Sequence, residues 1–215
     1  MKKQKITLLL LILIINVGNA QKKWFEGSLI LKNGDTIIGN LKLPLINKGV
    51  LVNYHKIKFK KSEKDKEFEF DHSNVNKALI KERNNKTAIF EYVKTSRSKY
   101  QLFKLIEFKK VKLYARTVSN STMSLGMIGG ERGFTSSTYY SSQDNEFYVL
   151  RKNEKIASPL ITLPTNMSAS LFTKSFRKRA MKYFSDCPSL VKKLKKREFR
   201  ESQILKVIAE YESCE

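Results

Sequence analysis

Between Trp24 and about Pro164 the sequence alternates apolar and polar residues in short runs that are separated by turn residues. A period of two is the pattern of strands with one buried face. The clearest example is the pair of runs at 25–31 and 37–43, which flank Asn33-Gly34-Asp35. An Asn-Gly pair between two such runs is the strongest short signal for a β-hairpin. The pattern therefore predicts a mostly β architecture for this part of the chain.

Further runs of the same character predict additional strands in one mostly antiparallel sheet. One face of this sheet is expected to be buried, and the other, studded with lysines, to lie in water. Periodicity alone leaves two arrangements open, a small barrel and a sandwich. The runs lie at about 50–60, 66–71, 87–94, 100–108, 111–116 and 146–151.

The stretch 119–145 is crowded with Ser, Thr, Gly and Tyr and has almost no strand periodicity, which predicts a long loop. Two interpretations of this loop stay open. It is either a binding lid or partner-contacting loop, since long loops on rigid scaffolds often carry function, or an excursion without a role. Its glycines at 126–133 lack the Lys-Ser/Thr of a phosphate cradle, and Phe134 follows instead, so no nucleotide site is predicted.

From about Ser168 the apolar period becomes helical, which predicts a three-helix segment over 166–215 after a β-rich domain over 21–165. The second helix begins near Asp186-Cys187-Pro188, where Asp is suited to cap a helix and Pro is tolerated in the first turn. The predicted apolar stripes are Phe172, Phe176, Ala180 and Tyr183 with Phe184; Leu190, Val191 and Leu194; and Ile204, Leu205, Ile208 and Tyr211 in a third helix from about Glu201 to Ser213.

The first residues have the three-part order of a secretory signal. Lys2, Lys3 and Lys5 precede an unbroken apolar run from Leu8 to Ile15, and small residues follow at Gly18-Asn19-Ala20. We therefore expect residues 1–20 to be removed on export.

The competing interpretation of the N-terminus is a membrane anchor. The apolar stretch from Ile6 to Val17 is shorter than the ~20 residues that a helix needs to cross a bilayer. The first cysteine after this stretch is Cys187, so the thiol on which a bacterial lipoprotein carries its lipid is missing. The mature chain, from Gln21 on, is expected to be free in the periplasm or outside the cell.

The chain has two cysteines, Cys187 and Cys214. An even count in an exported protein favours a disulfide. In a hairpin of the last two helices, ~10 residues rising and ~12 returning at 1.5 Å per residue bring the two cysteines to the same level. A redox pair or a metal site is the alternative, but no Cys-x-x-Cys is present, and His55 and His72 lie far away in the strand region. We predict a structural disulfide and no metal.

The charge is strongly positive, with 42 Lys and Arg against 20 Asp and Glu. Without the three signal lysines the net charge is +19. Such a bias favours contact with anionic surfaces such as nucleic acid, lipid headgroups or acidic polysaccharide. The alternative is that the scattered lysines only fill solvated positions. The candidate contacts are Lys174, Arg177, Lys178, Arg179, Lys182, Lys192, Lys193, Lys195, Lys196 and Arg197.

No catalytic motif or cofactor site is evident. A Ser-His-Asp or Cys-His site would need His55 or His72, and neither follows a nucleophile motif. Asp71 and His72 are neighbours in a predicted strand and would point to opposite faces. Sequence spacing does not test a pair of convergent carboxylates.

Both ends of the chain resemble small exported proteins of unknown function from flavobacteria-like Gram-negative bacteria. The resemblance is carried by Asn19-Ala20-Gln21, by Phe25-x-Gly27-x-Leu29-x-Leu31-x-Asn33-Gly34-Asp35-x-Ile37-x-Gly39, by Phe184-x-x-Cys187-Pro188-x-Leu190 and by Tyr211-x-x-Cys214. It implies a periplasmic or secreted setting in which a disulfide is plausible, and it supplies no activity, ligand or catalytic residue.

Three hypotheses for the function follow. The first is a non-catalytic cell-envelope protein whose β-domain binds an envelope protein or a glycan. The second is an electrostatic binder of an anionic polymer or membrane surface, through the basic helices. The third is an unrecognised hydrolase, built on carboxylates or on one of the histidines.

Overall fold

The computed structural model of the chain describes residues 24–44, 47–48, 56–82, 85–126, 136–162 and 175–214. The predicted signal peptide, residues 1–20, lies outside these ranges. The elements below belong to the described ranges.

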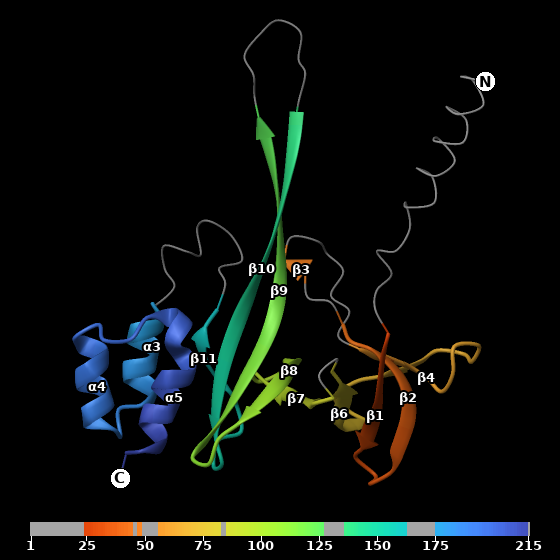
Figure 1. The fold of residues 1–215 in the computed structure, drawn as a ribbon, viewed down its shortest axis with the longest axis horizontal. Helices are drawn as coiled ribbons and strands as arrows, with labels where there is room; N and C mark the ends of the chain where they lie inside the picture. Colours follow the sequence, from red (N-terminus) through yellow and green to blue (C-terminus); the bar gives the residue numbers. More distant parts are fainter. Residues whose placement is uncertain are drawn as a thin grey trace, which may run out of the picture.

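Eleven strands belong to one sheet (Figure 1). They are β1 (Phe25–Leu31), β2 (Thr36–Lys42), β3 (Asn47–Lys48), β4 (Ile57–Lys60), β5 (Phe68–Phe70), β6 (Val75–Lys81), β7 (Thr87–Lys94), β8 (Tyr100–Glu107), β9 (Val111–Gly126), β10 (Ser136–Arg151) and β11 (Ser158–Ile161).

Ten of these strands pair antiparallel in the order β11-β10-β9-β8-β7-β6-β1-β2-β4-β5, and β3 pairs parallel with β9. The path of described strands ends at β11 on one side and at β5 on the other, so the sheet is not a closed barrel. The predicted α+β class and the antiparallel sheet are confirmed, and the barrel alternative is wrong.

The first hairpin forms where the Asn-Gly pair predicts it. Gly34 has a φ of +96°, a conformation that suits glycine. The backbone N–H of Asp35 donates to Oδ1 of Asn33 at 3.1 Å, and the N–H of Leu31 donates to the carbonyl of Asp35 at 2.8 Å. The turn chemistry thus holds β1 and β2 in register.

Strand β6 was not predicted, although it pairs with both β1 and β7. Its buried residues are Val75, Ala78 and Ile80, which do not alternate. The reason is a register shift against β1 between Ile30 and Leu31, which changes the face that the first residues of β6 present. An irregular strand of this kind has no clean period of two.

The predicted loop 119–145 is corrected by the structure. Its parts 119–126 and 136–145 are the distal ends of β9 and β10, paired residue by residue from Thr117↔Asn145 to Gly126↔Ser136. Residues 127–135 lie outside the described ranges. In Figure 1 these strands extend beyond the rest of the sheet as a two-stranded ribbon. Strands pair through their backbone groups, so these segments form a ladder without an alternation of apolar and polar residues.

The C-terminal segment forms helices, as predicted: α3 (Phe176–Tyr183), α4 (Pro188–Lys195), a 3₁₀ turn η1 (Glu201–Gln203) and α5 (Ile204–Glu212). Together they pack against β9, β10 and β11. Their buried residues form a helix-side core with strand residues. This core contains Val111, Leu113, Val149, Leu160, Ile161, Phe176, Ala180, Phe184, Cys187, Leu190, Leu194, Ile204, Val207, Ile208 and Tyr211.

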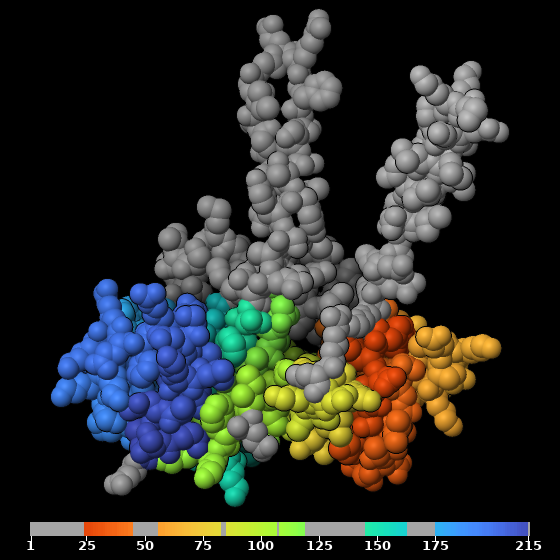
Figure 2. Space-filling model, viewed as in Figure 1, coloured from red at the N-terminus to blue at the C-terminus, as the bar shows by residue number. Residues whose placement is uncertain are grey.

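A second cluster, the hairpin-side core, lies at the other end of the same sheet face. Residues paired across antiparallel strands point to one face. The pairs run without a break from Leu29 through Ala78, Phe90, Lys104 and Ala115 toward β10. Figure 2 shows the helices at one end of the molecule and β1 with β2 at the opposite end. The hairpin-side core contains Leu29, Leu41, Ile57, Phe59, Val75, Ala78, Ile80 and Leu102.

The opposite face of the sheet is not wholly a solvated face, contrary to the prediction. Phe103, Tyr114 and Tyr148 pack there in a third buried cluster, with ring centroids 4.9 Å apart for Phe103 and Tyr148. Ala157, from the connection between β10 and β11, covers them and donates its N–H to the carbonyl of Lys94 at 2.9 Å. The connection between β10 and β11 therefore buries part of the sheet face that the alternating sequence pattern predicts to be solvent-exposed.

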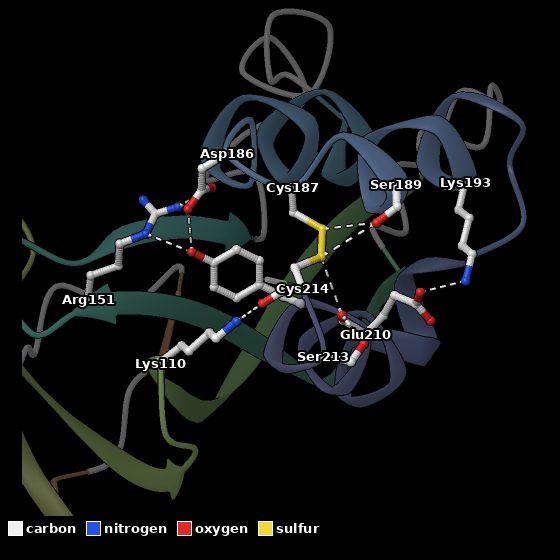
Figure 3. The surroundings of a disulfide bond; sticks show 10 residues. Lys110, Arg151, Asp186, Cys187, Ser189, Lys193, Glu210, Ser213 and Cys214 are labelled. Atoms are coloured by element: carbon white, nitrogen blue, oxygen red, sulfur yellow. Dashed lines mark hydrogen bonds and ion pairs between the residues drawn. A yellow bond between two sulfur atoms is a disulfide. The ribbon is translucent and has the colours of Figure 1, made fainter.

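Cys187 and Cys214 lie at disulfide distance, with Cα atoms 5.9 Å apart (Figure 3). Cys187 precedes the first turn of α4, and Cys214 follows the end of α5. The start of one helix is thus level with the end of the other, which is the geometry that the helix lengths predict.

Glu212 attaches α5 to the turn between β8 and β9. Its carboxylate accepts the backbone N–H of Lys109 at 3.1 Å and that of Lys110 at 2.9 Å. Lys110 Nζ also donates to the carbonyl of Cys214. The cysteine pair and the docking of α5 on the sheet therefore lie side by side. Among the described helices, none has the length and apolar character needed to cross a membrane.

Replacing both cysteines (Cys187→Ser with Cys214→Ser) is expected to lower the free energy of unfolding by about 3 kcal/mol. A bridge over a sequence separation of 27 restricts the unfolded chain by about that amount. Urea unfolding of the oxidised protein and of the double variant measures the difference. Adding a reductant should destabilise the wild type and leave the variant unchanged; equal stability of the oxidised wild type and the variant would contradict a bond between the two residues.

Candidate binding groove

A groove of about 600 Å³ lies on the shared sheet face, between the helix-side core and the hairpin-side core. Phe147 and Ile204 line it on the helix side, and Phe25, Phe90 and Leu102 line it on the hairpin side. Of the sixteen described residues around it, ten are apolar. The groove is therefore an apolar gap between two separately closed parts of one core.

The floor of the groove consists of paired strands. Phe90 pairs with Lys104, Lys104 with Ala115, and Ala115 with Phe147, so these residues follow one another across β7, β8, β9 and β10. Their backbone N–H and C=O groups take part in the ladders. The floor thus presents side chains to an occupant, and few backbone donors or acceptors.

At the groove, β9 stops pairing with β8 and continues paired with β10. Strand β8 pairs with β9 from Lys104 to Glu107, and with β7 from Tyr100 to Lys104. Past Ala115, β9 continues into the two-stranded ribbon with β10. The groove lies where the ribbon leaves β8, and its polar residues Thr117 and Asn145 belong to the base of the ribbon.

A buried ion pair lies behind this division, on the opposite face of the sheet. Arg116 and Glu146 face each other across β9 and β10, and Nε of Arg116 donates to Oε2 of Glu146 at 2.8 Å. The side chains are 9% and 2% exposed, respectively. The guanidinium lies 5.0 Å from the ring centroid of Phe103. Glu146 is thereby compensated, as a buried carboxylate has to be.

The outer wall of the groove comes from η1 and α5. Ser202, Ile204 and Leu205 line it, and Leu205 is 51% exposed. The prediction that Leu205 faces inward is wrong; Val207 is buried instead. Helical spacing alone does not separate these two positions, because the buried stripe depends on where the sheet meets the helix.

The charged residues that line the groove are cationic. Lys42, Lys104 and Arg116 line it, together with no carboxylate from the described residues. Lys104 is ion-paired with Glu82 at 2.5 Å. Lys42 has no ion-pair partner in the described part of the chain, and its Nζ lies 5.5 Å from the ring centroid of Trp24. Lys42 pairs with Lys58, next to the pair Leu41–Phe59, so its side chain points away from the sheet face that Leu41 shares with the groove.

A second cavity, of about 690 Å³, adjoins the groove and shares Phe25, Leu43 and Phe90 with it. Trp24 lines this second cavity, together with Glu26 and Glu82. Two carboxylates in one cavity are what a carboxylate hydrolase requires. Here Glu82 is already engaged by Lys104.

The predicted anionic-surface contacts are distributed over α3 and α4, and Lys174 lies outside the described ranges. Lys178, Lys182, Lys192, Lys195, Lys196 and Arg197 are exposed, whereas Arg177, Arg179 and Lys193 are partly buried. Lys193 is ion-paired with Glu210 of α5 at 2.5 Å. The structure therefore places most of these cations in solvent, while their role as contacts stays a prediction.

Two of these cationic residues line a cavity of about 630 Å³ between α3 and the β10–β11 end of the sheet. Arg179 and Lys182 line it together with Arg151. Arg179 donates from Nη1 to Oγ1 of Thr162 at 2.6 Å, and its buried Nε has no hydrogen-bond partner among the described residues. Lys192 and Lys195 line a separate cavity of about 330 Å³. Four of the basic residues thus line two cavities that share Ser185.

Arg151 joins the last long strand to the helices, a role that the sequence did not reveal. Its Nη2 donates to the carbonyl of Tyr183 at 2.7 Å. The same atom donates to Oδ1 of Asp186 at 2.7 Å, and Nε donates to the hydroxyl of Tyr211 at 3.1 Å (Figure 3). The predicted cap is corrected here: Cys187 is the N-cap of α4, without a side-chain cap. Asp186 instead accepts from Arg151 and, at 2.6 Å, from the hydroxyl of Tyr211.

Glu154 completes this network. Burial would raise the pKa of its carboxyl group, but hydrogen bonds from the Tyr183 hydroxyl at 2.6 Å and from the backbone and guanidinium of Arg151 outweigh burial and lower the pKa. Burial and the bond to Glu154 raise the pKa of Tyr183. The network is therefore held by an ionised carboxylate and a neutral phenol.

The described structure contains one of the two histidines. His55 lies outside the described ranges, and His72 stacks on the ring of Tyr100, with centroids 4.4 Å apart. In the described parts of the chain, no group of three or more His, Cys, Asp and Glu side chains is arranged to hold a metal ion.

Comparison with protein-family models, with curated proteins and with solved structures finds no match to this chain. The groove is accordingly interpreted from its own residues.

Replacing one partner of the buried ion pair is expected to cost about 3–5 kcal/mol of unfolding free energy, because a buried charge loses its compensation. This holds for Arg116→Met and for Glu146→Leu. The double variant should be more stable than either single one, since it leaves no unpaired charge. Urea unfolding of the four proteins measures the coupling; additive losses would show that the two residues act independently.

The network around Arg151 predicts a dependence of stability on pH. A carboxyl group whose pKa is lower in the folded than in the unfolded state stabilises the fold above its unfolded pKa of about 4.3, and this contribution is lost as the pH falls through the folded value. Glu154→Gln should therefore be less stable than the wild type at pH 7, with a smaller difference at pH 3. Urea unfolding at both pH values measures it.

The matched control is Glu198→Gln, which alters an exposed carboxylate that has no side-chain hydrogen bond in the described structure. The interpretation of Glu154 would be wrong if both variants lost the same stability at pH 7, or if the effect of Glu154→Gln grew on acidification.

Proposed function

We propose that the protein is an exported, non-catalytic binding protein of the cell envelope, and that the groove between the two cores is its binding site. The observation that carries this proposal is the lining of the groove, ten apolar residues out of the sixteen described ones around about 600 Å³. Ligand sites are usually apolar concavities of ~300–1,000 Å³ with a few polar groups that orient the ligand.

An exposed leucine in the wall of the groove favours a ligand-binding site over a defect in the packing of the core. Leu205 is 51% exposed, although Ile204, Val207, Ile208 and Tyr211 of the same helix are buried. A leucine at the rim of an apolar groove gains burial when a ligand enters, at about 25 cal/mol per Å² of apolar surface. The export signal predicted for residues 1–20 and the resemblance of both chain ends to exported proteins support the cell envelope as the setting.

Leu205→Lys is expected to abolish ligand retention and to leave folding intact, because a charged side chain would then stand at the wall of an apolar site. Ile38→Lys is the matched control: Ile38 is also an exposed apolar residue, at 75% exposure, and does not line the groove. Wild type and both variants are incubated with envelope extract and repurified in about 1 M salt, where the Debye length is about 3 Å. Mass spectrometry then identifies the molecules retained.

Retention by the wild type and by the Ile38→Lys variant, but not by the Leu205→Lys variant, supports the groove. Retention of the same molecules by all three proteins, or by none of them, would contradict it. Circular dichroism spectra of the three proteins verify that they are folded alike.

The cavity beside α3 favours a second candidate function, electrostatic binding of an anionic polymer. Nε of Arg179 has no partner within the described ranges, and the neighbouring Lys182 is exposed. Binding of this kind falls steeply with salt. Material that all three proteins capture at low salt and release at about 1 M salt would support this candidate in place of the groove.

A further inference from the structure

We propose that the protein pairs with a second copy of itself through the outer edge of β10, so that the two-stranded ribbons of two chains join into one four-stranded ribbon. This surface lies outside the groove, and the inference does not depend on what the groove binds. Three observations support it: the open edge of β10, the way in which the two ends of the sheet are closed, and the charge of the ribbon.

The outer edge of β10 is open along the ribbon. From Ser136 to Asn145, β10 pairs on one side with β9, residue by residue. On its other side lies β11, whose pairing is confined to residues 147–149 of β10. These ten residues span about 34 Å, and their outward backbone N–H and C=O groups have no partner strand in the described chain. The outer edge of β9 is less open, because β3 pairs with it at Ser119 and Asn120.

The two ends of the described sheet are closed by the means that soluble proteins use against edge-to-edge pairing. At one end β11 has four residues, contains Pro159 and packs against α3. At the other end β5 has three residues, and its Glu69 is ion-paired with Lys56 at 3.3 Å. The edge of β10 is longer, and the segment 136–145 contains neither a proline nor a basic residue. An edge left open in a sheet with protected ends is suited to a partner strand.

The ribbon is almost without charge in a strongly basic chain. Segments 117–126 and 136–145 have one charged residue, Asp144, in twenty positions, whereas 29% of the whole chain is charged. Like charges that face each other across a strand pair are destabilising. Two copies of a chain with a net charge of +19 therefore approach each other most readily along this segment. Figure 1 shows the ribbon extending beyond the rest of the sheet, which leaves the two bodies apart.

A second copy fits this edge by symmetry. A strand that pairs antiparallel with its own copy is related to it by a twofold axis, so each donor of one edge meets an acceptor of the other. The middle of the open edge lies at Tyr140 and Ser141, and we expect the axis there. An edge about 34 Å long and about 10 Å thick buries about 700 Å² over both copies, less than the ~1,200 Å² of stable interfaces. The dimer should therefore dissociate on dilution.

The experiment is sedimentation equilibrium of the purified protein from about 1 μM to about 1 mM, the range in which a weak contact dissociates. We expect a reversible equilibrium between monomer and dimer without larger species, since each chain offers one β10 edge. Ser141→Lys and Ser141→Glu should each raise the dissociation constant of the dimer roughly fivefold, because equal charges then face each other near the axis. An equimolar mixture of these two variants should restore the dimer, because the charges are then opposite.

The matched controls are Ser121→Lys and Ser121→Glu. Ser121 lies directly opposite Ser141 on β9, so the residue type and the change in net charge are the same. Across the twofold axis the two new charges are then three strand spacings apart, about 14 Å, where salt at about 0.15 M screens them. These variants should dimerise as the wild type does. Circular dichroism spectra verify that all variants are folded like the wild type.

The proposal is overturned if the wild type stays monomeric up to the highest concentration, or if the Ser121 variants weaken the dimer as much as the Ser141 variants do. It is equally overturned if the mixture of the two Ser141 variants associates no better than either alone, or if oligomers larger than a dimer form. Binding in the groove is tested separately by Leu205→Lys, so the failure of one proposal leaves the other standing.

Discussion

One face of a long, open antiparallel sheet has to be kept from water, and the rest of the structure depends on how this is done. The strands alone close only part of it: the hairpin-side core forms where β1, β2, β4 and β6 bury Leu41 and Ile57. At the other end Leu113 and Val149 are covered by the three helices. Strands bury one end of this face and helices cover the other, so a gap remains between the two cores on the same face. That gap is the groove.

The contacts that hold the helices on the sheet act at a distance from the groove. Arg151 binds Asp186 and Tyr211, Glu212 accepts the N–H groups of the β8–β9 turn, and Cys214 lies beside that turn. These contacts position α5, and α5 supplies the groove wall with Leu205. The groove is therefore as rigid as the attachment of the helices, which links the stability of the C-terminal segment to binding.

Local signals predicted the elements that depend on local chemistry. The Asn33-Gly34 turn, the helical periods after residue 175 and the level positions of Cys187 and Cys214 all appear in the structure. The signals failed where the surroundings decide. A register shift against β1 hides the period of β6, and the Ser- and Thr-rich ends of β9 and β10 form a ribbon although they do not alternate. Asp186 was expected to cap α4, but it binds Arg151.

By itself, the sequence determined a β-rich domain followed by basic amphipathic helices and a cysteine pair, because period, turn residues and helix length act over a few neighbouring positions. Only the tertiary structure decided that Phe25, Phe147 and Leu205 line one groove. Those residues come from opposite parts of the chain. They meet because of strand order, sheet division and helix docking, which are set by packing across the whole molecule and leave no signature in any single segment.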